Sequence, residues 1–137
     1  MMGNYFPVYC VYYGAMENYK QVIGRQGEDE AVKHLLENGY LISDRNFKTR
    51  FGEIDIIAFD KNEIVFVEVK KRTGAAYGIA QSAVDFRKQR KLAKMAFYYI
   101  KTKHFYNRNF RFDVLAITDN NLELIKNAFI IDRGYFY

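Results

Sequence analysis

Residues 52–71 constrain the fold of this chain more than any other segment. Two runs rich in β-branched residues, 54–58 and 64–69, flank a polar turn, which is typical of a β-hairpin. With Asp60 paired with Glu63 across the turn, alternate residues of each run fall on opposite faces. The predicted apolar pairs are Ile54–Val69, Ile56–Val67 and Ala58–Val65; those on the other face are Glu53–Lys70, Asp55–Glu68 and Ile57–Phe66. A shift of one residue would mix the two faces, so the pattern favours this register.

The predicted register sets the carboxylates of Asp55 and Glu68 opposite each other. Their Cβ atoms would lie roughly 5 Å apart, which is destabilising unless a cation sits between them. A hard divalent cation such as Mg²⁺ binds one or two carboxylates and keeps several waters for phosphate chemistry. The alternative is that Glu53 and Lys70 form an ordinary ion pair and that the two acids decorate a solvated face.

A helix is predicted over residues 26–38, with Glu28 in its first turn and Gly39 at its end. Its buried stripe consists of Ala31, Val32, Leu35 and Leu36. Because Glu28 lies three and four residues before members of that stripe, its side chain belongs to the core-facing side and needs a partner. The alternative is an exposed Glu28 that only favours the helix dipole.

A second and longer helical pattern covers residues 80–101, and it is strongly basic. No acid between Arg87 and Lys101 balances its charge, which favours a phosphate-binding role over an ordinary solvated face. The cations predicted to bind nucleic acid are Arg87, Lys88, Arg90, Lys91 and Lys94 on this helix, together with Arg72 ahead of it.

Further strands are expected over residues 40–47, 111–118 and 122–130. Together with the helices they predict an α/β (α+β) fold, in which a central mixed sheet contains the hairpin. A chain of 137 residues suits one domain, assigned to residues 20–137. Residues 1–19 are expected to be an N-terminal extension, and the first fifteen of them are either an extension or an upstream mis-start.

The net charge of the chain and the motifs that it lacks reduce the number of functions it could have. A formal charge of +5 and a pI near 9.2 suggest a polyanionic partner such as nucleic acid. The lone Cys10 fits a reducing compartment, so a cytoplasmic location is expected, and no apolar run reaches membrane-spanning length. The sequence contains no Walker phosphate loop, dinucleotide-binding glycine pattern, zinc-spaced Cys/His cluster or recognisable Ser/His/Asp signature.

A string of short motifs resembles the YraN family of uncharacterised bacterial proteins from about Gly24 to Phe129. These motifs are Gly27-Glu28, Gly39-Tyr40, Asn46-Phe47, Gly52-Glu53-Ile54-Asp55, Phe66-Val67-Glu68-Val69-Lys70, Ala83-Val84, Lys88 and Arg111-Phe112-Asp113-Val114. That family belongs to the PD-(D/E)XK nuclease superfamily and is similar to archaeal Holliday junction resolvases. The resemblance therefore implies a restriction-endonuclease-like core. One departure is Ser82, where the pattern has an acid.

The resemblance also implies a site. Asp55, Glu68 and Lys70 match the superfamily's Asp, Glu and Lys, and Glu28 matches the helical Glu of the resolvase-like branch. Mg²⁺ or Mn²⁺ would be held by Asp55, Glu68, the backbone carbonyl of Val69, and Glu28. Lys70 would orient water or stabilise charge on phosphorus.

The implied function is metal-dependent cleavage of nucleic acid, with DNA, and branched DNA in particular, as the expected substrate. Two alternatives stay open: a non-catalytic nucleic-acid-binding module that keeps the nuclease fold, and a structural partner in a larger assembly. A homodimer is also expected by analogy with the resolvases. Phe110, Phe112 and Phe129 are either members of its surface or part of the core.

Overall fold

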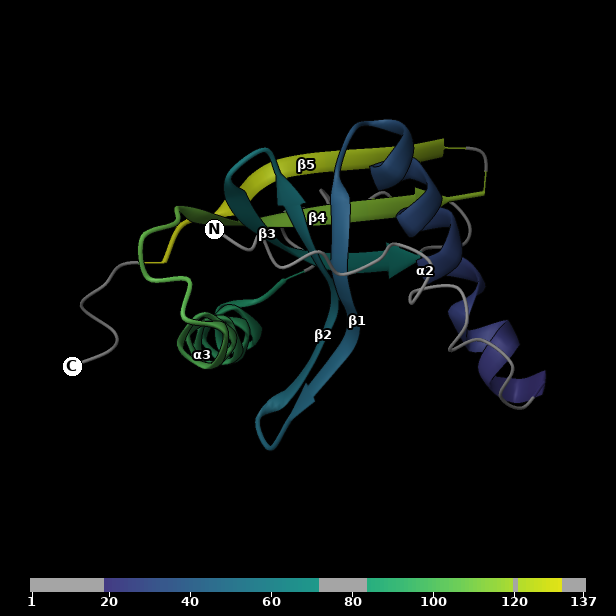
Figure 1. The fold of residues 1–137 in the computed structure, drawn as a ribbon. Helices are drawn as coiled ribbons and strands as arrows, with labels where there is room; N and C mark the ends of the chain where they lie inside the picture. Colours follow the sequence, from purple (N-terminus) through teal and green to yellow (C-terminus); the bar gives the residue numbers. More distant parts are fainter. Residues whose placement is uncertain (1–18, 72–83, 120, 132–137) are drawn as a thin grey trace.

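Five strands form one mixed sheet in the order β1-β2-β3-β4-β5, with helices α2 and α3 packed on its opposite faces (Figure 1). The computed structural model describes residues 19–71, 84–119 and 121–131. Its elements are α2 (Tyr19–Glu37), β1 (Leu41–Thr49), β2 (Gly52–Asp60), β3 (Glu63–Lys71), α3 (Phe86–Lys103), β4 (Phe110–Thr118) and β5 (Asn121–Phe129). Strands β3 and β4 are parallel and α3 makes the crossover between them, whereas the other neighbouring strands are antiparallel. The predicted α+β class is confirmed, and the architecture is consistent with a restriction-endonuclease-like core.

The β2–β3 hairpin has the predicted register near its turn but not along its whole length. Pairs run from Asp60–Glu63 to Ile56–Val67. Beyond Val67, β3 continues to pair with β4 as far as Lys71. The predicted ladder pairs Ile54–Val69, Asp55–Glu68 and Glu53–Lys70 are therefore wrong, because β2 leaves β3 at this point and pairs with β1 alone.

The backbone of β1 is kinked at Asn46, level with this separation, between the pairs Arg45–Ile56 and Phe47–Ile54. Asn46 has a left-handed φ of 52°, which asparagine tolerates better than most residues. It breaks the alternation of the strand: Arg45 forms ion pairs with α2, whereas the ring centroid of Phe47 lies 5.2 Å from that of Tyr99 on α3. In β2, Ile56 likewise belongs to the core beneath α2 and Ile54 to the core beneath α3, so the predicted common face for these two residues is also wrong.

The β1–β2 turn consequently reaches across to α3. Figure 1 shows it projecting away from β4 and β5, on the side of the molecule where α3 lies. A Cβ atom placed on Gly52 would lie 3.6 Å from Cε of Met95, so the turn is seated on the helix. The hairpin arm and α3 thus form the two walls of a cleft.

Two apolar clusters fill the faces of the sheet. One joins α2 to Ile56, Ala58, Val65 and Val67; the other joins α3 to Ile57, Phe66 and Phe112. Phe112 is 3% exposed, and Phe110 and Phe129 are partly buried against the same cluster. These aromatic residues were predicted to belong either to a dimer surface or to the core. The structure supports the second prediction, and they do not make a free dimer surface.

Both helices begin elsewhere than predicted. Helix α2 starts at Tyr19 rather than at residue 26, so Glu28 lies well inside the helix and the alternative of an exposed first turn is wrong. Helix α3 starts at Phe86 rather than at residue 80, since Asp85 adopts an extended conformation and its side chain accepts a hydrogen bond from the Lys88 N–H. The predicted strands agree with the observed ones to within one or two residues.

Some predictions fall outside the described residues. These are the N-terminal extension up to residue 18, Arg72, the loop over residues 74–78 and Ser82. Among the helices that are described, none is both long and apolar enough to cross a membrane.

Candidate functional site

A cleft of about 630 Å³ lies between the β1–β2 arm and the first turns of α3. Its strand side is lined by Phe51, Gly52, Glu53, Asp55 and Glu68. Its helix side is lined by Asp85, Arg87, Lys88, Lys91, Leu92 and Met95. Acidic and basic walls therefore face each other across one opening.

Two acids of this wall, Glu53 and Asp55, form a cluster with Glu28 of α2. Glu28, Glu53 and Asp55 each offer an oxygen, and these oxygens all lie within 4.8 Å of one another. Glu28 comes from the middle of α2 and the other two come from β2. Three hard oxygen donors at this separation form a set that Mg²⁺ or Mn²⁺ can bind.

The ionised form of Asp55 is disfavoured by its surroundings. Burial, followed by the charges of Glu68 and Glu28, raises its pKa from 3.8 to about 7. Its Oδ2 atom accepts a hydrogen bond from the Val69 N–H at 2.8 Å, which opposes the rise without cancelling it. A carboxylate in this position is stabilised by a proton or by a cation.

Glu68, whose charge acts on Asp55, has two cationic partners of its own. It is 5% exposed, and its Oε1 accepts a hydrogen bond from the Lys88 ammonium and lies 3.5 Å from the Lys70 Nζ. Partial burial alone would lower the pKa of Lys88, but the bond to Glu68 raises it. Lys70, predicted to pair with Glu53, lies beside Glu68 instead, and Lys88, predicted to bind phosphate, here neutralises Glu68.

The basic residues of α3 divide between two places. Arg87, Lys88 and Lys91 line the cleft. Arg90 and Lys94 line a smaller neighbouring pocket with Phe86 and Ile130. The predicted cation cluster is therefore not a single surface: three of its helical members line the acidic cleft, Arg90 lines the smaller pocket, and Lys94 lines that pocket with its ammonium 5.6 Å from the ring centroid of Phe51.

The sequence reasoning missed two residues. The register predicts Glu53 opposite Lys70, with an ordinary ion pair as one alternative, whereas its position two residues before Asp55 on one strand is a signal that both acids share a side. Arg45 lies with its Nη2 atom 2.6 Å from Oδ1 of Asp29 and 3.7 Å from Oε2 of Glu28. It fixes the helical acid to the strand, and no sequence pattern indicated this because it depends on the kink at Asn46.

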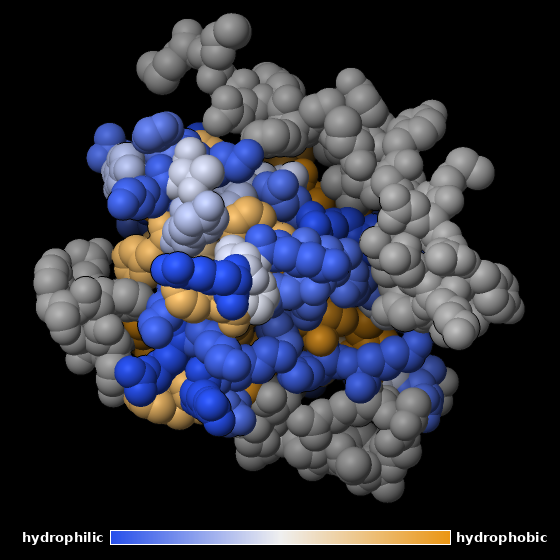
Figure 2. All heavy atoms as spheres, turned by 90° about the horizontal axis from the view of Figure 1, so that it is seen from below, coloured by the Kyte–Doolittle hydropathy of each residue, from blue (hydrophilic) through white to orange (hydrophobic). Residues whose placement is uncertain are grey.

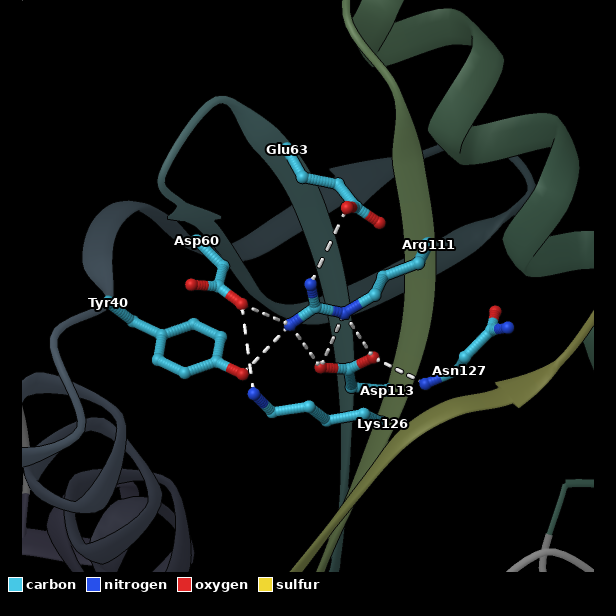
Figure 3. A network of polar contacts seen from close by, with 7 residues as sticks. All are labelled: Tyr40, Asp60, Glu63, Arg111, Asp113, Lys126 and Asn127. Carbon is cyan, nitrogen blue, oxygen red and sulfur yellow. Dashed lines mark hydrogen bonds and ion pairs between the residues drawn. The ribbon is translucent and has the colours of Figure 1, made fainter.

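A second polar network, shown in Figure 3, lies at the other end of β2 and has a structural role. The Arg111 guanidinium donates to Asp113, Asp60 and the Tyr40 hydroxyl, at distances of 2.8 to 3.2 Å. Asp113, with no exposed side-chain area, also accepts a hydrogen bond from the Asn127 N–H at a β5 irregularity. The Arg111–Val114 motif therefore braces the sheet and contributes nothing to the cleft.

Comparison with known proteins places this chain in a family. A family model described as "Uncharacterised protein family UPF0102" matches residues 27–117. A UPF0102 protein of Persephonella marina is 43% identical over 114 residues, covering 83% of this chain and 98% of the relative. UPF0102 proteins of Thermodesulfovibrio yellowstonii and Clostridium tetani are 49% and 47% identical, covering 78% and 83% of this chain and 95% and 98% of each relative.

Proposed function

The chain belongs to the UPF0102 family of uncharacterised proteins, and from its cleft we propose that it is a metal-dependent nuclease that hydrolyses phosphodiester bonds of nucleic acid. The observation that carries the proposal is the cluster of Glu28, Glu53 and Asp55, of which Glu53 and Asp55 line the same cleft as cations of α3. DNA is the expected substrate. The cytoplasm is the expected location.

The residues present fit a divalent cation. Glu28, Glu53 and Asp55 would hold it, and the raised pKa of Asp55, caused first by burial and then by the charge of Glu68, means that its ionised form is disfavoured without a cation. Glu68 and the carbonyl of Val69 are further candidate ligands, provided that Lys88 releases the Glu68 carboxylate. When bound, Mg²⁺ or Mn²⁺ would polarise the scissile phosphate and lower the pKa of a bound water.

The remaining side chains of the cleft have roles in binding and charge stabilisation. Arg87 and Lys91 would contact the phosphate backbone. Lys70, held near Glu68, is the candidate to stabilise the charge that develops on the phosphorus oxygens or to orient the attacking water. Lys88 would move from Glu68 to the incoming phosphate, exchanging one anion for another.

Cleavage of labelled linear, flapped and four-way DNA and of RNA, with Mn²⁺ or with EDTA, tests the proposal. We expect Asp55→Asn to lower the rate by at least about a hundredfold, as loss of a ligand does. The matched control is Glu63→Gln on the same hairpin, an acid of the Arg111 network that lies outside the cleft and should keep wild-type activity.

Calorimetry with Mn²⁺ separates the alternatives. Wild type and Glu63→Gln should bind Mn²⁺ alike, and Asp55→Asn should bind it about ten- to a hundredfold more weakly. Equal Mn²⁺ affinities in all three proteins contradict the site. Binding of both Mn²⁺ and nucleic acid without cleavage of any substrate contradicts catalysis and favours the non-catalytic binding module.

A further inference from the structure

An exposed aromatic residue stands at the mouth of the cleft. Phe51, in the β1–β2 turn, is 37% exposed although it is a large apolar side chain, and it lines the same cleft as Glu53 and Asp55. It lies four residues before Asp55, at most about 13 Å of extended strand. Figure 2 views the molecule from the side toward which this turn projects, and there hydrophobic groups are set among mainly hydrophilic residues.

The backbone around Phe51 is held in place. The hydroxyl of Thr49 accepts a hydrogen bond from the Phe51 N–H at 3.1 Å and donates one to the Gly52 carbonyl at 3.4 Å. Gly52 has a φ of +141°, a conformation that favours glycine, and it lies against Met95 of α3. Since the turn is fixed on both sides, the ring is presented to solvent at a defined place beside the acids.

Two cations flank the ring. The Cζ atom of Arg50 lies 4.9 Å from its centroid, and the Nζ atom of Lys94 lies 5.6 Å from it. Cations over an aromatic face are attracted by the ring quadrupole. An aromatic ring beside a guanidinium plane, next to a groove lined by Arg87 and Lys91, combines a stacking surface with phosphate contacts.

We propose that Arg50 and Phe51 form a stacking platform for an unpaired nucleobase beside the acidic cluster. Bases inside a duplex have both faces covered by their neighbours, so only an unpaired or splayed nucleotide can use such a platform. The substrate class is therefore nucleic acid with a single-stranded segment next to the phosphate that is cut. The inference rests on the proposed function, because it requires that nucleic acid enters this cleft.

Binding in EDTA tests the platform independently of cleavage. Fluorescence anisotropy compares a labelled single strand with a duplex of the same length. We expect Phe51→Ala and Phe51→Leu to weaken single-strand binding about tenfold, since neither side chain offers an aromatic ring for stacking, and to leave duplex binding within about twofold. Phe51→Leu keeps the apolar character, so an unchanged single-strand affinity in this variant overturns the role of the ring.

The matched control is Tyr106, an exposed aromatic residue beyond the C-terminal end of α3 and outside the cleft. Tyr106→Ala should leave both affinities unchanged. An equal loss in Tyr106→Ala and Phe51→Ala would assign the effect to general surface apolarity and overturn the platform.

A spectroscopic readout adds a signature that a merely structural role would not give. The chain contains no tryptophan, so Phe51→Trp introduces a single tryptophan, which can be excited selectively in the presence of the twelve tyrosines. Its emission should be quenched by a single strand and much less by a duplex, whereas that of Tyr106→Trp should respond to neither. Absence of quenching in Phe51→Trp while the single strand is bound overturns the inference.

The outcomes also distinguish this inference from the nuclease proposal. If wild type binds no nucleic acid in EDTA and cuts none with Mn²⁺, both are contradicted. If the Phe51 variants behave as expected and no substrate is cut with Mn²⁺, the platform stands and catalysis fails. If cleavage is abolished in Asp55→Asn but single-strand binding is unchanged in Phe51→Leu, the nuclease stands and the platform fails.

Discussion

The ionised form of Asp55 is subject to opposing effects: burial and neighbouring acids disfavour it, and a backbone hydrogen bond favours it. Its carboxylate is largely removed from water, lies among other acids and accepts a backbone hydrogen bond from β3. The hydrogen bond explains why an acid is placed where β2 and β3 separate, because it satisfies the Val69 N–H that a ladder partner would otherwise bind. The same position makes the ionised form costly until a cation is present.

This cost predicts how stability depends on pH in the absence of metal. Because the pKa of Asp55 is raised from 3.8 to about 7 on folding, the folded state holds a proton that the unfolded state has released. The associated stability is complete below the unfolded value and is lost as pH rises through about 7. Urea unfolding in EDTA should therefore show wild type losing about 2 kcal/mol between about pH 5 and pH 8 relative to Asp55→Asn.

Asparagine keeps the oxygen that accepts from the Val69 N–H and cannot ionise, so it is the appropriate comparison. Adding Mn²⁺ at about pH 8 should restore stability to wild type and not to the variant. Parallel stability curves for the two proteins from pH 5 to pH 8 would show that Asp55 ionises in the folded state as it does in water.

The individual residues of the site were predicted unevenly. The period of two in residues 52–71 was sufficient to single out Asp55 and Glu68, and the helical spacing was sufficient to turn Glu28 inward. The partners were not predictable, because they depend on where strands separate. Glu68 lies with Lys88 and Lys70, and Glu28 and Asp55 lie with Glu53, since β2 leaves β3 just before Asp55.

The β1–β2 arm forms one wall of the cleft, and its first strand combines a register shift between Ile42 and Asp44 with a left-handed residue, Asn46. Runs of apolar and β-branched residues predicted both strands, but a left-handed residue within a strand leaves no periodic signal. Asn46 is a residue type that tolerates this conformation, which is compatible with the kink without predicting it. Similarly, Val84 fits the apolar pattern of α3, so that pattern did not show that the helix begins only after the Asp85 cap.

Replacing Asn46 tests the contribution of the kink. Alanine incurs the steric cost of a left-handed conformation, so Asn46→Ala should lower the free energy of unfolding by about 1 to 2 kcal/mol. Glycine adopts that conformation without strain, and Asn46→Gly should stay within about 1 kcal/mol of wild type. Urea unfolding measures both, and equal losses in the two variants would assign the effect to the asparagine side chain instead of the backbone.

At the scale of the whole molecule, the topology brings segments distant in sequence to one opening. Parallel pairing of β3 with β4 requires a crossover, and the basic helix α3 is that crossover. The order of predicted elements was therefore enough to infer an α+β fold with the helix beside the hairpin. Which cations face the acids depends on the rotation of α3, which is set by packing of Leu92, Met95 and Tyr99 in the core.

The division of the cations leads to a prediction about salt dependence. Arg87 and Lys91 line the acidic cleft, so Arg87→Ala/Lys91→Ala should remove phosphate contacts and lower the slope of log K against log salt by about 0.9 for each phosphate that the protein no longer neutralises. Binding to duplexes of different sequence should weaken equally, because phosphate contacts carry no sequence information. Titrations in EDTA at several salt concentrations give the slope without cleavage.

Lys33→Ala/Lys101→Ala is the matched control, since it removes the same charge from exposed positions on α2 and at the end of α3, both outside the cleft. Its slope should equal that of wild type. If it lowers the slope as much as the cleft variant does, binding follows net charge alone. If neither variant changes the slope, nucleic acid does not contact this wall of the cleft, and the facing acids and cations serve a purpose other than holding a phosphate backbone.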